Sequence, residues 1–136
     1  MLLVIAVLGL AICVPVALLA NNRNRVDAEA TMLAQSELEQ ILAQPLTATS
    51  FVDASSNTVS LGAGGCSLVN GKIDFSQAAV AGYNATVSGS KGARYDLRWY
   101  VQSLADTGKQ FNIAARRTGS QGSLLSPVNL AVRLGR

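Results

Sequence analysis

The N-terminal stretch Met1–Leu42 constrains the fold of this chain more than any other part of it. Residues Met1–Ala20 carry no charged side chain, and a helix of about twenty residues extends about 30 Å, the thickness of a bilayer core. In the second half, apolar residues recur at helical spacing: Val26, Ala30, Leu33, Leu38 and Ile41. Pro45 disfavours helical backbone at the residue before it. The sequence therefore predicts one long helix that ends near Leu42, apolar in its first half and amphipathic in its second.

Small residues follow one face of the apolar half. They recur at intervals of three or four positions: Ala6, Gly9, Cys13, Ala17 and Ala20. Small side chains let two helices approach closely where apolar burial supplies no driving force, so we expect this stripe to be the subunit packing surface. Gly9 and Pro15 each weaken a helix, and any helix break should fall between them.

Three interpretations of the apolar segment remain open. A cleaved secretory signal normally starts with basic residues, whereas no charge precedes Arg23. A single-pass membrane anchor fits the length, but Arg23 and Arg25 would then hold the following domain in the cytoplasm. The third interpretation is a helix that rests in a membrane and later packs into the core of a filament. The stripe of small residues favours this third interpretation.

The rest of the chain predicts short loops followed by strands. Residues Thr47–Ser60 are rich in small and hydroxyl side chains and predict a loop with at most a short strand. Asn70-Gly71 between two short apolar runs is a hairpin signal. From Tyr95 the apolar residues alternate with polar ones along three segments, with the predicted buried positions Tyr95, Leu97, Trp99 and Val101, then Phe111, Ile113 and Ala115, then Val128, Leu130, Val132 and Leu134.

Three antiparallel strands with one apolar face need a cover, and the amphipathic half of the helix is the only long element that can provide it. We therefore predict an α+β fold, with a long N-terminal helix packed by its second half on a small antiparallel sheet. The expected organisation is an apolar helix half (1–20), an amphipathic helix half (21–44) and a globular sheet region (45–136). The expected helix–sheet core comprises Leu33, Leu38, Ile41, Leu97, Trp99, Phe111 and Ile113.

The residues of the helix resemble a known family. The run Val4-Ile5-Ala6-Val7-Leu8-Gly9 followed by a proline is similar to the N-terminal helix of type IV pilins and type II secretion pseudopilins. The stretch Ala30–Ile41 and the strand pair Tyr95–Val101 and Lys109–Ile113 resemble the minor-pilin branch of that family. The resemblance implies a pilin-like lollipop fold. It also implies a basic leader, cut by a prepilin peptidase, and an N-terminal Glu just before Met1, unless this chain starts differently from the family.

Composition bears on the chemistry of the chain. There is no histidine, and no nucleophile elbow or phosphate-binding loop occurs, so we expect no enzyme activity, no metal or cofactor and no small-molecule substrate. Cys13 and Cys66 are the only cysteines, and we expect Cys66 to be free or to pair between chains. Residues 91–136 carry a net charge of +6. Outward-facing Arg98, Arg116 and Arg133 would allow DNA binding through phosphates, although a solvated face or pairing with neighbouring subunits is the simpler interpretation.

These observations favour a structural subunit of an extracellular type IV pilus or pilus-like filament. Its candidate partners are further copies of this chain and other pilins, and it would occupy the inner membrane of a bacterium before assembly at the cell surface. The alternative is a single-pass, membrane-anchored extracytoplasmic binding module that does not polymerise.

Overall fold

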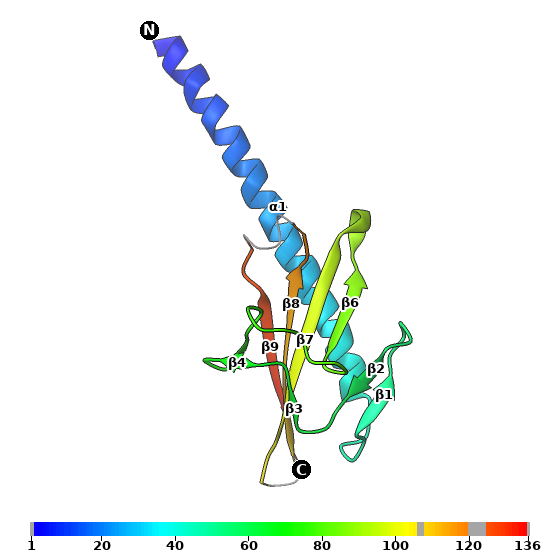
Figure 1. The fold of residues 1–136 in the computed structure, drawn as a ribbon. Helices are drawn as coiled ribbons and strands as arrows, with labels where there is room; N and C mark the ends of the chain where they lie inside the picture. The colour runs from blue at the N-terminus through cyan, green and yellow to red at the C-terminus, as the bar shows by residue number, and fades with distance from the viewer. Residues whose placement is uncertain (1, 106–107, 120–124, 136) are drawn as a thin grey trace.

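A single long helix runs through the first third of the chain. The computed structural model describes the backbone of residues 2–105, 108–119 and 125–135, and within these ranges the side chains from residue 17 onward. Helix α1 (Leu2–Leu42) is continuous and projects from the rest of the molecule at its N-terminal end (Figure 1). Its described backbone stays helical through the interval from Gly9 to Pro15. The helix ends at Leu42, as Pro45 predicts.

The main sheet has five antiparallel strands. These are β3 (Gly64–Gly65), β6 (Asn84–Ser88), β7 (Arg94–Ser103), β8 (Lys109–Arg117) and β9 (Val128–Leu134). Strand β7 pairs with β8 on one side and with both β3 and β6 on the other, and β9 pairs with β8. The predicted α+β arrangement of one N-terminal helix and a mostly antiparallel sheet is confirmed. The three predicted strands are β7, β8 and β9, and the sheet gains two more on the far edge of β7.

Helix α1 covers one face of this sheet, behind β7 and β8 in Figure 1. Its buried apolar residues are spaced three or four positions apart: Val26, Ala30, Ala34, Leu38 and Ile41. On the sheet, Tyr95, Leu97, Trp99 and Val101 of β7 are all fully buried. The apolar face of the helix therefore packs against the apolar face of the sheet. This interface stabilises the fold because it removes both surfaces from water.

Residues 47–60 form more structure than their composition predicts. Strands β1 (Ser50–Val52) and β2 (Thr58–Ser60) pair as a hairpin. The Asp53 carboxylate accepts hydrogen bonds from the amides of Ser55 (2.9 Å) and Asn57 (2.7 Å), which fixes the turn between the strands. The prediction of a loop with at most a short strand missed one of these two short strands. The reason is that β1 alternates weakly: Phe51 is half-buried and Val52 is exposed, so no apolar face is visible in the sequence.

A small layer covers the other face of the sheet. Strands β4 (Leu68–Val69) and β5 (Lys72–Ile73) form a hairpin whose turn residues Asn70 and Gly71 have φ values of 52° and 74°. These left-handed values are those of the Asn-Gly hairpin turn, which confirms that prediction. In Figure 1 this segment crosses in front of the sheet, on the side away from α1. Cys66, Ile73 and Ala114 form the buried cluster beneath it.

Candidate assembly surface

The helix leaves the domain before it reaches its apolar half. Every residue from Ala17 to Arg25 is exposed, and Val26, at 4% exposure, is the first described residue that packs against the sheet. Leu18 and Leu19 are 63% and 71% exposed, although both are large apolar side chains. Such side chains normally lie in a core, so this part of α1 presents an apolar surface without a partner in the described chain.

The predicted packing stripe lies only partly within this described surface. Ala17 and Ala20 are exposed, as a contact between subunits requires. The side chains of Ala6, Gly9, Cys13 and Pro15 lie outside the described residues, so the stripe as a whole stays a prediction.

A second helix face carries two shallow grooves. One, of about 210 Å³, is lined by Leu18, Asn21, Asn22 and Arg25. The next, of about 340 Å³, continues from Arg25 along Ala28 and Glu29 to Met32, which is 69% exposed. Because Leu18, Arg25 and Met32 are seven residues apart, they share one side of the helix, and this side differs from that of Ala17 and Ala20. This face cannot be recognised in the sequence, because its apolar residues are interrupted by Asn and Arg.

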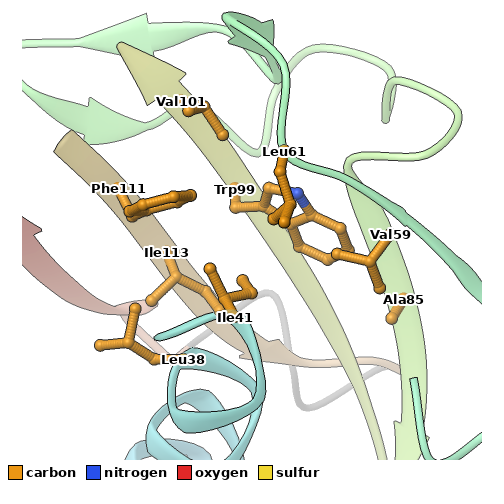
Figure 2. Close-up of a cluster of buried hydrophobic side chains, with 9 residues drawn as sticks. All are labelled: Leu38, Ile41, Val59, Leu61, Ala85, Trp99, Val101, Phe111 and Ile113. Carbon is orange, nitrogen blue, oxygen red and sulfur yellow. The ribbon is translucent and has the colours of Figure 1, made fainter. Parts of the chain in front are cut away.

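The predicted helix–sheet core falls into two neighbouring clusters. The first contains Leu38, Ile41, Trp99, Phe111 and Ile113, together with Val59 and Leu61 from β2 and the residue after it (Figure 2). Trp99 is fully buried and its indole N–H donates a hydrogen bond to the Ser60 carbonyl (3.1 Å). Figure 2 shows Leu61 and Val59 against the indole, so the β1–β2 hairpin shares with α1 the task of covering Trp99.

The second cluster holds the remaining two predicted core residues. Leu97 is fully buried beside Ala30, Ala34 and Tyr95, and half-buried Leu33 packs against this group. The structure therefore does not place all seven predicted residues in one cluster. Small alanines on α1 leave room for the large Leu97 and Tyr95 side chains of β7, while the helix backbone lies nearest to β8 and β9.

Glu29 joins the helix to the beginning of strand β7 and to the turn before it. Its carboxylate accepts hydrogen bonds from the Tyr95 hydroxyl (2.6 Å) and from the Ser90 amide at the start of the short 3₁₀ turn η1 (Ser90–Gly92). The bond from Tyr95, followed by that from Ser90, lowers the pKa of Glu29. Burial and the bond to Glu29 raise the pKa of Tyr95 to about 12. Both shifts favour a carboxylate that accepts from a neutral phenol.

Glu37 is the unusual charged group of the helix. It is only 4% exposed, and its Oε1 atom has no hydrogen-bond partner among the described residues. Burial, and then the charge of nearby Asp53, raise the pKa of Glu37 to about 7. The helical periodicity of the sequence could have predicted the burial of residue 37, since it lies between the buried positions 34 and 41 on the same helix face.

The basic outer face predicted from the sequence is largely covered. Arg98 is 8% exposed rather than outward-facing: it forms a salt bridge with Asp96 (2.8 Å) and donates to the Gln77 carbonyl (2.6 Å). The guanidinium carbons of Arg98 and Arg116 lie 4.8 Å and 4.6 Å from the centre of the Phe75 ring, within cation–π range. Arg133 is exposed. The prediction of outward arginines was wrong for Arg98 and for half-buried Arg116, because the segment that contains β4 and β5 packs over this face, and it is confirmed for Arg133.

Cys66 is fully buried and free. Its sulfur lies 3.4 Å from the Tyr83 carbonyl oxygen and accepts from the Val80 amide at 3.5 Å. A thiol of a second chain would have to open the layer above this sulfur to reach it, so its burial favours the free thiol over the pairing between chains.

Within the part of the chain that the structure describes, no helix is both long and apolar enough to cross a membrane. No group of three or more Cys, Asp or Glu side chains among these residues has the arrangement of a metal site. Comparison with known proteins found no matching family model, no matching curated protein and no matching solved structure.

Proposed function

We propose that this chain is a structural subunit of an extracellular pilus-like filament, assembled through the N-terminal half of α1. The observation that carries the proposal is the exposed helix segment from Ala17 to Arg25, with Leu18 and Leu19 more than half exposed. The segment continues, as one helix, into the uncharged residues before it. A chain of this shape can bury its apolar helix against the helices of neighbouring copies while its folded domain stays on the outside.

The driving term of this assembly is the removal of apolar side chains from water, at about 25 cal/mol per Å² of buried apolar surface. The stripe of small residues would set the distance between neighbouring helices. The uncharged run is also the segment that would hold the subunit in the membrane before assembly. In the mature filament the sheet region would form the outer surface.

Replacing Gly9 by Leu tests this proposal. The larger side chain falls on the predicted helix–helix contact and not in the sheet domain, so we expect it to abolish filaments in electron micrographs while residues 21–136 keep their circular dichroism spectrum. Ala11→Leu is the matched control, because residue 11 lies on the opposite side of an ideal helix from the stripe. Ala11→Leu should leave filaments intact.

Two outcomes would contradict the proposal at different levels. Normal filaments from the Gly9→Leu chain would show that the stripe is not the contact. Filaments from a chain lacking residues 1–20 would show that the helix does not drive assembly, and the pilin-like interpretation would fail.

A groove in the folded domain makes the membrane-anchored binding module a second candidate function. A polar groove of about 540 Å³, lined in part by Glu37, opens beside the helix within the folded domain. This module would use the same apolar helix as an anchor without polymerising. It predicts that neither the Gly9→Leu chain nor the unmodified chain forms filaments.

A further inference from the structure

The groove beside Glu37 lies where three elements meet. Its walls come from α1, from the turn between β1 and β2, and from strand β6, which forms an edge of the sheet in Figure 1. Most of its polar groups are neutral: Ser36 and Gln40 on the helix, Ser55 on the turn, and Thr86 and Ser88 on β6. Glu37 is the one charged residue that lines the groove, and no described Lys or Arg does so.

Glu37 lacks the partner that a buried carboxylate requires. Its Oε1 atom accepts no hydrogen bond from any described residue. The neighbouring Asp53 carboxylate cannot donate a hydrogen bond to the Glu37 carboxylate. It already accepts from the amides of Ser55 and Asn57 and from the Asn57 side chain (3.0 Å). A buried charge without a partner is costly, and a cation entering the groove from outside would remove that cost.

Strand β6 offers a second feature at the same place. Among the described strands, β6 (Asn84–Ser88) pairs with β7 alone, and Thr86, Val87 and Ser88 line the groove. The open side of an edge strand presents unpaired N–H and C=O groups. Proteins that recognise extended peptides use such an edge for main-chain hydrogen bonds and use adjoining pockets to select side chains.

We propose that this groove binds an extended peptide of another protein, which adds to the free edge of β6 and places an arginine side chain on Glu37. The guanidinium group is preferred over an ammonium group because it is planar, is more weakly hydrated and can donate to a carboxylate and a hydroxyl at once. The inference does not depend on filament assembly.

The exposed strand arginines of a second copy are poorly placed to be the source of this arginine in antiparallel addition. Its exposed Arg133 lies on β9, where Leu130, Val132 and Leu134 pack on the α1 side, so Arg133 points to the opposite face of the sheet. Arg94 on β7 alternates in the same way with Tyr95, which packs toward the helix. If β9 of a second copy were added antiparallel to β6 in one continuous sheet, Arg133 would therefore lie on the face away from α1. Strand β7 is already paired on both sides, so it is not available for such an addition.

The test uses the full-length chain in detergent micelles and the synthetic peptide acetyl-Thr-Val-Arg-Val-Thr-amide. We expect this peptide to bind and to shift the amide NMR signals of Thr86 and Ser88 more than those of β9. A peptide with citrulline in place of arginine, which has the same shape without the charge, should bind about 30-fold more weakly or worse. Methylation of alternate peptide nitrogens should also weaken binding, because it removes the main-chain donors.

Two variants complete the experiment. Glu37→Gln should weaken binding of the arginine peptide to the level of the citrulline peptide. Glu39→Gln, which changes an exposed carboxylate two residues away, should leave binding unchanged. Any of four results would overturn the proposal. The arginine and citrulline peptides could bind with equal affinity, or the arginine peptide could bind the Glu37→Gln chain as tightly as the unmodified chain. The arginine peptide could also fail to bind, or could shift signals of β9 rather than of β6. The citrulline comparison is made on the unmodified chain, so it stands even if a variant folds poorly.

Discussion

Glu29 and Tyr95 lie 66 residues apart in the sequence and meet through one hydrogen bond of 2.6 Å. Tyr95 is fully buried, so its hydroxyl would be costly to leave without an acceptor. The same carboxylate binds the Ser90 amide. One side chain of the helix thus holds both the start of β7 and the turn before it.

Tyr95→Phe should reduce the free energy of unfolding by about 1–2 kcal/mol at pH 7, because it removes a charge-assisted hydrogen bond. The bond lowers the pKa of Glu29 below its ordinary value of 4.5. A lowered carboxyl pKa adds stability above the unfolded value, and this stability is lost as the pH falls through the folded value. Urea unfolding at pH 7 and pH 3 should therefore show the difference between the two chains shrinking in acid. An equal loss at both pH values would mean that the charge of Glu29 does not contribute to the bond made by the Tyr95 hydroxyl.

Glu37 predicts the opposite pH dependence. Its pKa rises from 4.5 to about 7 on folding, so the folded protein holds the proton more tightly than the unfolded chain. Stability should then fall as the pH rises from about 4.5 to 7, by about 1–2 kcal/mol because water still screens part of this carboxyl group, and change little above that. Glu37→Gln should remove this fall, so that the variant is more stable than the unmodified chain at pH 8.

Urea unfolding at pH 5 and pH 8 measures this effect. The control is Glu39→Gln, since Glu39 is exposed on the same helix. If the Glu37→Gln and unmodified chains lost equal stability over this interval, another group would account for the pH dependence.

At the scale of elements, two glycines show how strand placement depends on close contact. Gly65 of β3 has a φ of +134°, and a Cβ there would lie 2.5 Å from the Trp99 carbonyl oxygen and 2.8 Å from the Tyr100 Cα. Gly71 in the β4–β5 turn has a φ of +74°, but a Cβ there would meet nothing within 4 Å. The two positions share an unfavourable backbone and differ in their surroundings.

Gly71→Ala should cost about 1–2 kcal/mol, the penalty of a left-handed conformation. Gly65→Ala should cost about 1–3 kcal/mol more, because backbone atoms of β7 must move to admit the methyl group. Thermal unfolding of both variants tests the difference. Equal losses would indicate that β3 does not lie tightly against β7.

The same elements explain why strand prediction succeeded in part. Strands β7, β8 and β9 alternate apolar and polar residues over seven or more positions, which is a local signal. Strand β3 consists of two glycines and β6 of Asn84–Ser88 with two small apolar residues. Pairing with β7, and not their own composition, makes them strands.

For the whole molecule, the helix divides into a part that touches the domain and a part that does not. Residues 17–20 are exposed, so among the described residues the removal of 1–20 deletes no contact with the sheet. We expect residues 21–136 to fold alone, and Ala30→Leu, which enlarges a buried residue facing Leu97 and Tyr95, to lower the Tm of this fragment. Circular dichroism melting measures both. An unfolded fragment would show that the first helix half supports the domain directly.

The sequence by itself determined the elements whose cause is local. Pro45 determines where the helix ends, and Asn70-Gly71 determines a hairpin turn. The alternation of apolar and polar residues determines the three long strands. The apolar spacing of α1 also indicated which side would meet the sheet. These features depend on residues within a few positions of one another, so they can be predicted from sequence.

Only the tertiary structure decided which polar groups lose their contact with water. Arg98 is expected at the surface from its alternation in β7, yet it is buried because a segment 20 to 30 residues earlier packs over it. The groove at Glu37 requires α1, the β1–β2 turn and β6 to converge. Such convergence depends on contacts between distant residues, for which no local pattern exists, and it alone creates the low-dielectric surroundings that change the chemistry of a carboxyl group.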